Sequence, residues 1–238
     1  MCTVSFVPAG IRSCILTSNR DESLQRGLAM APRRLLYNES VIICPQDPLA
    51  HGSWIAAGEK GRLTCLLNGA FKKHKRHLPY RMSRGRVVLD SLTFDSAASF
   101  AAAYDFTYIE PFTMVMVSND EDLLLYELRW DGHQKHFKEL NASERHLWSS
   151  ATLYDAEMMA EKESVFEKCM DALQAISAHT LSGIHEKHFR YEDWVLPPAR
   201  VTEVVTLSVT AVECNPDQSS MYYRDLVNKE LPVAVLSV

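Results

Sequence analysis

The first residues of the chain have the types and the spacing of half of a catalytic site. Cys2 follows Met1, and the run Asn19-Arg20-Asp21-Glu22 comes about one short strand pair later. Initiator methionine is usually removed when the next residue is small, and Cys2 would then carry both a thiol and a free α-amine. A thiol with a pKa of ~8.5 is mostly protonated at neutral pH, but an α-amine with a pKa of ~7.7–8.0 can accept its proton, directly or through water. Cys2 is therefore a candidate nucleophile.

Three further side chains have the chemical types that such a nucleophile requires. The guanidinium of Arg20 would lower the pKa of a neighbouring thiol, and the carboxylate of Asp21 would orient an α-ammonium group. The side-chain amide of Asn68 can donate a hydrogen bond to the oxyanion of an acyl-transfer reaction. We therefore name Cys2, Arg20, Asp21 and Asn68 as the candidate catalytic residues.

A hairpin at the start of the chain is predicted to position the first of these groups. Residues 2–7 and 13–17 are rich in β-forming side chains, and Pro8-Ala9-Gly10 between them is a turn signal. The second strand is expected to end in the polar run 19–22. Charged residues at the exit of a buried strand are costly unless they are paired, so they should reach solvent or serve a site.

A second hairpin is predicted to carry Asn68. Residues 51–57 and 61–68 have strand-like sequence and are joined by a glycine-containing turn. The segment between the two hairpins, from Gln25 to Pro48, contains three prolines and only one short apolar run. We expect that segment to be a loop.

The rest of the chain predicts a mixed architecture. Helices are expected from Arg84 to Leu92 with Ser83 as the cap, from Asp95 to Ala103, and from about Asp155 to Ala178, where apolar residues keep helical spacing through Ile176. Further strands are expected at 112–117, 123–128, after Gly132, and at 204–212 and 221–224. Strands, then helices, then strands again predict a layered α+β sandwich, in one domain spanning residues 1–238.

Composition excludes several classes of protein. Of the 238 residues, 47% are hydrophobic and 23% are charged, as in an ordinary globular protein, and the net charge is -5. That charge argues against a chain built around nucleic-acid contacts. No apolar run approaches the ~20 residues of a membrane-spanning helix. The six cysteines are scattered without a CxxC pair, which favours reduced thiols and a cytoplasmic location.

Two other features have simple interpretations. Residues 71–77 form the most basic run of the chain. A solvated loop is favoured over a nucleic-acid patch, an anionic-membrane patch or a localisation signal. An intermediate interpretation is a mobile flap that attracts an anionic substrate. His179, His185 and His188 lack the spacing of a zinc motif. We expect no metal and no cofactor.

Several short motifs carry a family resemblance. The chain begins Met-Cys-Thr, continues with Thr17-Ser18-Asn19-Arg20-Asp21-Glu22, and later contains Gly52-Ser53-Trp54 and Leu66-Leu67-Asn68. In these motifs it resembles the NRDE family, also called transport-and-Golgi-organisation-2-like. The similarity extends through Arg84-Gly85-Arg86 and, more weakly, through Trp148-Ser149-Ser150-Ala151.

The resemblance implies a fold and a set of roles. The fold is the four-layer αββα sandwich of N-terminal-nucleophile hydrolases, and the relatives include choloylglycine and penicillin V acylases, which cut non-peptide carbon–nitrogen amide bonds. By position, Cys2 is the nucleophile, Arg20 lies near the thiol, Asp21 contacts the α-amine and Asn68 belongs to the oxyanion hole. The binding partner implied is a small-molecule amide. Asn19, Trp54 and Ser150 are expected to contact the substrate.

The chain departs from the family pattern at two places. Ser149-Ser150 stands where a serine-asparagine pair is common, and the strand expected at 204–212 lacks an arginine that the acylases use. Arg200 and Arg224 are candidates to replace that arginine. The alternative function is a non-catalytic binding or trafficking protein, for secretory organisation or haem handling, on the same fold. The sequence leaves a homo-oligomer open.

Overall fold

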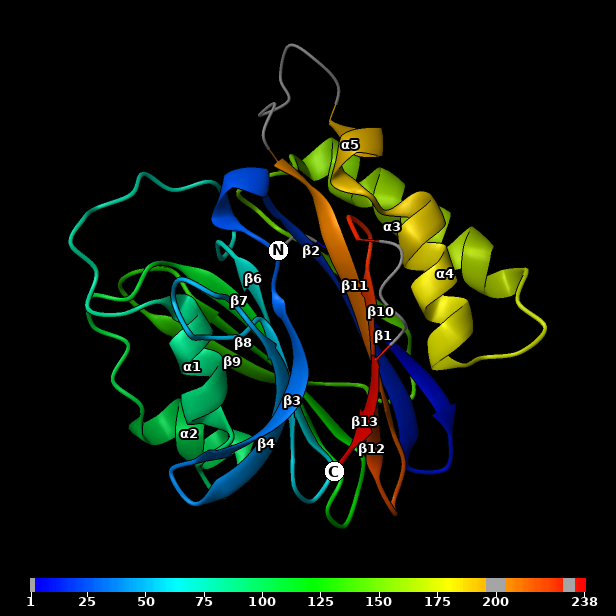
Figure 1. The fold of residues 1–238 in the computed structure, drawn as a ribbon, viewed down its shortest axis with the longest axis horizontal. Coiled ribbons are helices and arrows are strands. Elements are labelled where there is room, and N and C mark those ends of the chain that lie inside the picture. The colour runs from blue at the N-terminus through cyan, green and yellow to red at the C-terminus, as the bar shows by residue number, and fades with distance from the viewer. Residues whose placement is uncertain (1–2, 196–203, 229–233) are drawn as a thin grey trace.

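The computed structural model describes residues 3–195, 204–228 and 234–238, so that Cys2 and Arg200 lie outside the described residues. Two antiparallel sheets lie face to face, and helices cover both outer faces (Figure 1). The layers follow the order helix, sheet, sheet, helix. The predicted α+β sandwich is confirmed.

The first sheet has the strand order β10-β1-β2-β11-β12-β13, and the second runs in chain order from β3 to β9. The first sheet is built from β1 (Thr3–Gly10), β2 (Ser13–Ser23), β10 (His146–Ser149), β11 (Val204–Cys214), β12 (Ser219–Asp225) and β13 (Ala234–Ser237). The second is built from β3 (Met30–Tyr37), β4 (Ser40–Gln46), β5 (Ile55–Gly58), β6 (Arg62–Asn68), β7 (Phe112–Ser118), β8 (Leu124–Trp130) and β9 (Lys135–Leu140).

Three apolar clusters hold these layers together. Val4 and Phe6 of β1 belong to the core between the sheets, with Trp54 from the other side. Helices α1 (Arg84–Ser91) and α2 (Ala97–Ala103) pack on the outer face of the second sheet. Helices α3 (Ala156–Asp171) and α4 (Ala178–His188) pack with residues of β1, β2 and β11 on the outer face of the first, near the short helix α5 (Tyr191–Trp194).

The first predicted hairpin is confirmed, but both strands are longer than expected. The turn predicted at residues 8–10 is wrong, because β1 continues to Gly10 and the chain turns at residues 11–12. Val4 of β1 pairs with Ser18 of β2, and β2 continues through the whole run Asn19–Glu22 to Ser23. Because β2 lies between β1 and β11, most side chains of this run are buried. Buried polar groups need hydrogen-bond partners, and these partners define the site below.

The prediction of a loop from Gln25 to Pro48 is wrong, because this segment contains strands β3 and β4. Proline is unusual inside a strand, but β3 lies at the edge of its sheet, where a missing N–H donor is tolerated. Its pairing with β4 is also irregular between Met30 and Arg33, around Pro32. Pro32 therefore marks an irregular edge strand, whereas Pro45 lies near the end of β4, inside the sheet.

The long helix expected from about Asp155 to Ala178 begins where it was predicted, but its predicted end is wrong. Asp155 caps α3, which stops at Asp171, and Ser177 starts α4 by forming a capping box with Thr180. Ile176, placed on the buried stripe by its spacing, is 40% exposed. A strong cap signal therefore interrupts the apolar periodicity.

The other predicted elements agree with the structure, apart from small shifts at their ends. Ser83 caps α1, and Ser96, one residue later than expected, caps α2. Strands β5 and β6 form the second hairpin, β7 to β9 form a meander, and β11 pairs with β12. No helix in the described ranges is both long and apolar enough to cross a membrane.

Candidate active site

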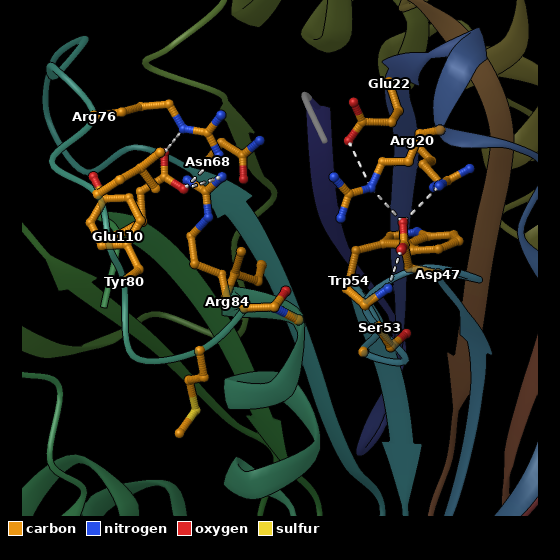
Figure 2. Close-up of a pocket in the computed structure, with 18 of the residues that line it drawn as sticks. Arg20, Glu22, Asp47, Ser53, Trp54, Asn68, Arg76, Tyr80, Arg84 and Glu110 are labelled. Carbon is orange, nitrogen blue, oxygen red and sulfur yellow. Dashed lines mark hydrogen bonds and ion pairs between the residues drawn. The ribbon is translucent and has the colours of Figure 1, made fainter. Parts of the chain in front are cut away.

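A cavity of about 520 Å³ is lined by three of the predicted site residues, Arg20, Trp54 and Asn68. It is lined by side chains from β2, from the segment before β5, from the end of β6 and from the segment before α1. Its volume is in the range of small-molecule binding sites, ~300–1,000 Å³. Two charged groups face each other across the close-up in Figure 2. We call them the Arg20 group (Arg20, Glu22, Arg26, Asp47) and the Glu110 group (His74, Arg76, Arg84, Glu110).

Arg20 is held firmly in the Arg20 group. Its side chain is 3% exposed, and Nη2 donates to Oδ2 of Asp47 at 3.1 Å. Its guanidinium lies over the ring of Trp54, 5.0 Å from the centroid, which is a cation–π contact between the two sheets. Nη1 also donates to the carbonyl oxygen of Gly27 at 3.3 Å. A buried, oriented cation therefore borders the cavity.

Asp47, which the sequence analysis did not single out, balances this cation. Arg26 donates to Asp47 at 2.8 Å, and the N–H groups of Leu49 and Ala50 donate to its other oxygen. Burial acts to raise the pKa of Asp47, but the hydrogen bond from Arg26 and the charges of both guanidinium groups outweigh burial and lower that pKa. Asp47 is therefore a carboxylate that fixes the position of Arg20.

Asp21 points to the opposite face of β2, as strand alternation requires. Thr206 of β11 donates to Oδ1 of Asp21 at 2.6 Å, and the hydroxyl of Tyr154 donates to Oδ2 at 3.3 Å. Both Asp21 and Thr206 are buried. Asp21 is therefore an oriented carboxylate on the helical side of the first sheet, and it does not line the cavity.

Asn68 lines the cavity, and Ser150 is hydrogen-bonded to the backbone of Asn68. The hydroxyl of Ser150 donates to the backbone carbonyl oxygen of Asn68 at 2.8 Å and contacts the hydroxyl of Thr152 at 2.9 Å. Ser150 is completely buried. It therefore fixes the end of β6, where the Asn68 side chain begins.

Asn19 takes part in a different network, under the helices of the first sheet. Its amide donates to the carbonyl oxygen of Phe189 at 2.7 Å, and its oxygen lies 2.6 Å from Nδ1 of His185. The other ring nitrogen of His185 lies 2.8 Å from the hydroxyl of Ser5. Asn19 therefore ties α4 to the sheet and does not line the cavity.

The network also explains His185, one of the three histidines that invited a metal interpretation. Both ring nitrogens of His185 have hydrogen-bond partners, and burial, followed by the charge of Lys162, lowers its pKa to about 3. Lys162 is itself fully buried and donates to the hydroxyl of Thr3 at 2.7 Å. Among the described residues, no group of three or more potential ligands could hold a metal ion.

The candidate replacement for the missing late-strand arginine lies elsewhere. Arg224 of β12 forms an ion pair with Glu186 of α4 at 2.9 Å, and its side chain is 48% exposed. It belongs to the helical side of the first sheet and is not part of the cavity lining. The other candidate, Arg200, is outside the described residues.

The Glu110 group was not anticipated as a unit. Glu110 accepts a hydrogen bond from Nε of Arg76 at 3.1 Å, forms an ion pair with Nη2 of Arg84 at 3.2 Å, and lies 3.3 Å from Nε2 of His74. Burial acts to raise the pKa of Glu110, but the charges of Arg84 and Arg76 outweigh it, so that the pKa is lowered. The basic run and the Arg84 motif, which gave separate signals in the sequence, meet here.

Taken together, the arrangement can bind a small molecule between two groups of charged side chains, with an amide side chain nearby. Arg20, Trp54 and Asn68 line the cavity, Ser150 supports Asn68, and Asp21 and Asn19 lie on the other face of β2. The position of Cys2 is outside the described residues.

Comparisons with solved structures agree with this fold. The structure is similar to a variant of conjugated bile acid hydrolase from Clostridium perfringens, with a TM-score of 0.62 and 11% identity over 100% of this chain and 92% of that chain. It is similar to the Caenorhabditis elegans ortholog of N-acylethanolamine-hydrolyzing acid amidase, with a TM-score of 0.58 and 11% identity over 88% of this chain and 92% of that chain. It is also similar to penicillin V acylase from Agrobacterium tumefaciens, with a TM-score of 0.57 and 8% identity over 100% of this chain and 86% of that chain.

At these identities the structural similarity shows the fold alone, which is that of the N-terminal-nucleophile hydrolases. No match was found among curated protein sequences. The sequence model of one family, Transport and Golgi organisation 2, matches residues 1–206. Because this match covers most of the 238-residue chain, the chain belongs to the Transport and Golgi organisation 2 family.

Proposed function

We propose that the protein is a thiol-dependent amidohydrolase that cleaves a non-peptide carbon–nitrogen amide bond of a small molecule. Cys2 is the nucleophile after removal of Met1. The observation that carries the proposal is the position of Arg20, whose buried guanidinium borders the cavity beside Trp54.

The reaction has two stages. The α-amine of Cys2 takes the thiol proton, the thiolate forms a bond to the amide carbon, and the carbon–nitrogen bond then breaks as the leaving amine receives that proton. Water attacks the resulting thioester, a carboxylic acid leaves, and the thiol is restored. The sum is amide plus water giving acid plus amine.

The neighbouring groups have defined roles in this scheme. Arg20 favours the thiolate form of Cys2, and Asp21, oriented by Thr206, favours and aligns the ammonium form of the α-amine. Asn68 donates to the oxyanion that forms at each stage. A thiol nucleophile needs a reducing compartment, and we propose the cytoplasm; the five described cysteines are free thiols.

Hydrolysis of a panel of small N-acyl amides by the wild type and by Cys2→Ser tests the proposal. The panel pairs short and long acyl chains with glycine, taurine and ethanolamine as leaving amines. Cys2→Ser should lower kcat/KM by on the order of 10³-fold or more, because a serine hydroxyl is a much weaker nucleophile here than a thiolate. Cys169→Ser, at a partly exposed thiol, is the matched control and should retain wild-type activity.

Two outcomes would count against hydrolysis. Unchanged turnover in Cys2→Ser would remove Cys2 from the mechanism. Tight binding of panel members without turnover by any Met1-free preparation would favour the non-catalytic binding function on this fold.

A further inference from the structure

We infer that the Glu110 group is a binding site for an acidic substituent of the substrate, so that the protein acts on small amides that carry a carboxylate, sulfonate or phosphate group. The inference deepens the proposed amidohydrolase function and rests on it for the amide. The binding site itself follows from charge, burial and geometry in the cavity.

The charges of the two groups differ. In the Arg20 group, two guanidinium groups face two carboxylates, since Arg20 and Arg26 contact Asp47 and Arg26 lies 3.8 Å from Glu22. In the Glu110 group, two guanidinium groups and an imidazole face one carboxylate. With the imidazole neutral, one positive charge remains uncompensated at this end of the cavity.

Burial strengthens the electrostatic effect of that excess positive charge. The side chain of Arg84 is only 15% exposed, and its charge is weakly screened by solvent there. Burial lowers the pKa of Arg84 despite the opposing effect of Glu110, and the charge of Arg76 lowers it further. A second anion would therefore stabilise this guanidinium.

The guanidinium groups also retain donors for an anion. Arg84 donates a hydrogen bond to the carbonyl oxygen of Pro111 at 3.1 Å and forms an ion pair with Glu110 at 3.2 Å. A guanidinium carries five N–H donors, more than these contacts use, and its planar fork suits carboxylate, sulfonate and phosphate oxygens. Arg76 comes from a segment without regular structure, and its side chain is 68% exposed, so it can adjust to a ligand.

The start of α1 adds to the positive electrostatic potential around the Glu110 group. Ser83, Arg84 and Gly85 line the cavity at the first turn of this helix. The partial positive charge of a helix N-terminus is worth ~0.5 elementary charge and acts within the first turn. It therefore reinforces the two guanidinium groups.

The remaining lining defines the rest of the ligand. Leu66, Leu78, Pro79 and Met82 contribute apolar surface to the cavity. The close-up shows the Arg20 group on the side of the cavity opposite the Glu110 group (Figure 2). The ligand class is therefore an amide with an apolar part and an acidic group at some distance from the scissile bond.

Direct binding to the Cys2→Ala protein tests the site without turnover. The probes are N-acylglycines with acyl chains from acetyl to decanoyl, each paired with its neutral N-acylglycinamide, and the corresponding N-acyltaurines and inorganic phosphate to separate the acidic groups. Calorimetry should show at least one acidic probe binding about tenfold or more tightly than its neutral partner. The preference should shrink as NaCl is raised.

Three variants locate the site. Arg76→Gln, at the exposed position, should reduce the preference for the acidic probe severalfold with the fold intact, and Arg84→Gln should abolish it. Arg81→Gln is the matched control, because Arg81 lies in the same segment but pairs with Asp105 outside the cavity. Absence of an acidic preference in every probe pair, or a preference unchanged in both Arg76→Gln and Arg84→Gln, would overturn the inference. Hydrolysis retained by Cys2→Ser would instead overturn the proposed function and leave these binding results standing.

Discussion

Gly52 and Gly85 are in backbone contact at the edge of the cavity. The N–H of Ser53 donates to the carbonyl oxygen of Gly85 at 3.0 Å, and a Cβ atom added to Gly52 would lie 2.5 Å from the carbonyl carbon of Gly85. Only residues without side chains allow this approach. The contact sets the first turn of α1 against the segment before β5, so that Arg84 and Trp54 line one cavity.

Alanine at position 52 should therefore weaken the fold. The new methyl group meets backbone atoms, which cannot rotate away, and we expect Gly52→Ala to lower the free energy of unfolding by about 1–3 kcal/mol. Urea denaturation measures this change. In the control Gly183→Ala, a Cβ atom would have no neighbour within 4 Å, and alanine is favoured over glycine in a helix by ~1 kcal/mol. Gly183→Ala should thus be stabilised, and a Gly52→Ala protein as stable as the wild type would show that the contact is not tight.

The buried imidazole of His185 should make the folded protein sensitive to acid. Burial, and then the charge of Lys162, lower the pKa of His185 to about 3, whereas histidine in an unfolded chain has a pKa of ~6.5. Between these values the unfolded state binds a proton that the folded state does not. Stability is therefore present above pH ~6.5 and is lost as the pH falls towards the folded pKa, by about 2 kcal/mol at pH 5.

Comparison of unfolding free energies at pH 7 and pH 5 isolates this contribution. His185→Gln removes the titrating group, so its loss of stability between the two pH values should be about 2 kcal/mol smaller than that of the wild type. His133→Gln, at an exposed histidine, should keep the wild-type difference. The same pH dependence in His185→Gln and in the wild type would mean that the imidazole is not held neutral.

Selective alkylation should distinguish Cys2 from the other thiols. A hydrogen bond with a neighbouring thiol lowers the pKa of Cys214 to about 6, but Cys214 is completely buried. Burial raises the pKa of Cys44 and of Cys65 to about 12. Cys169 is partly exposed, but burial raises its pKa as well. None of the described thiols combines exposure with a lowered pKa.

Brief treatment with iodoacetamide at pH 7, followed by peptide mapping, should therefore modify Cys2 first. Thiolate character and access together determine the rate of alkylation. Modification of Cys169 at the same rate as Cys2 would mean that Cys2 has an ordinary thiol, without activation by an amine or by Arg20.

Local sequence signals predicted most of the elements that frame the site. Alternation predicted the pair β1 and β2, although the turn lies at residues 11–12 and not at 8–10, and Ser83 predicted the start of α1. A strand pair joined by a short turn and a helix cap depend on residues that are close together in the sequence, so local sequence patterns can predict them. The prolines within β3 and β4 and the regular apolar spacing beyond Asp171 led to wrong predictions, because strand pairing and a helix cap outweighed local propensity.

The partners of the site residues could not be predicted in the same way. Arg20 of β2 meets Asp47, which follows β4 of the other sheet, and Arg84 of α1 meets Glu110, which precedes β7. No spacing in the sequence encodes such contacts. The motif signals at Arg20, Asp21 and Asn68 identified chemical types, but only the three-dimensional structure separates the cavity face of β2 from its helical face.

The intact mass of a preparation that hydrolyses an amide tests the central claim most directly. If Cys2 supplies both the nucleophile and the base, active protein must lack Met1, because a retained methionine would convert the α-amine of Cys2 into a peptide nitrogen that cannot accept a proton. We predict a mass lower than that of the full sequence by one methionine residue, with activity proportional to the processed fraction. Full hydrolytic activity in protein that retains Met1 would contradict the account.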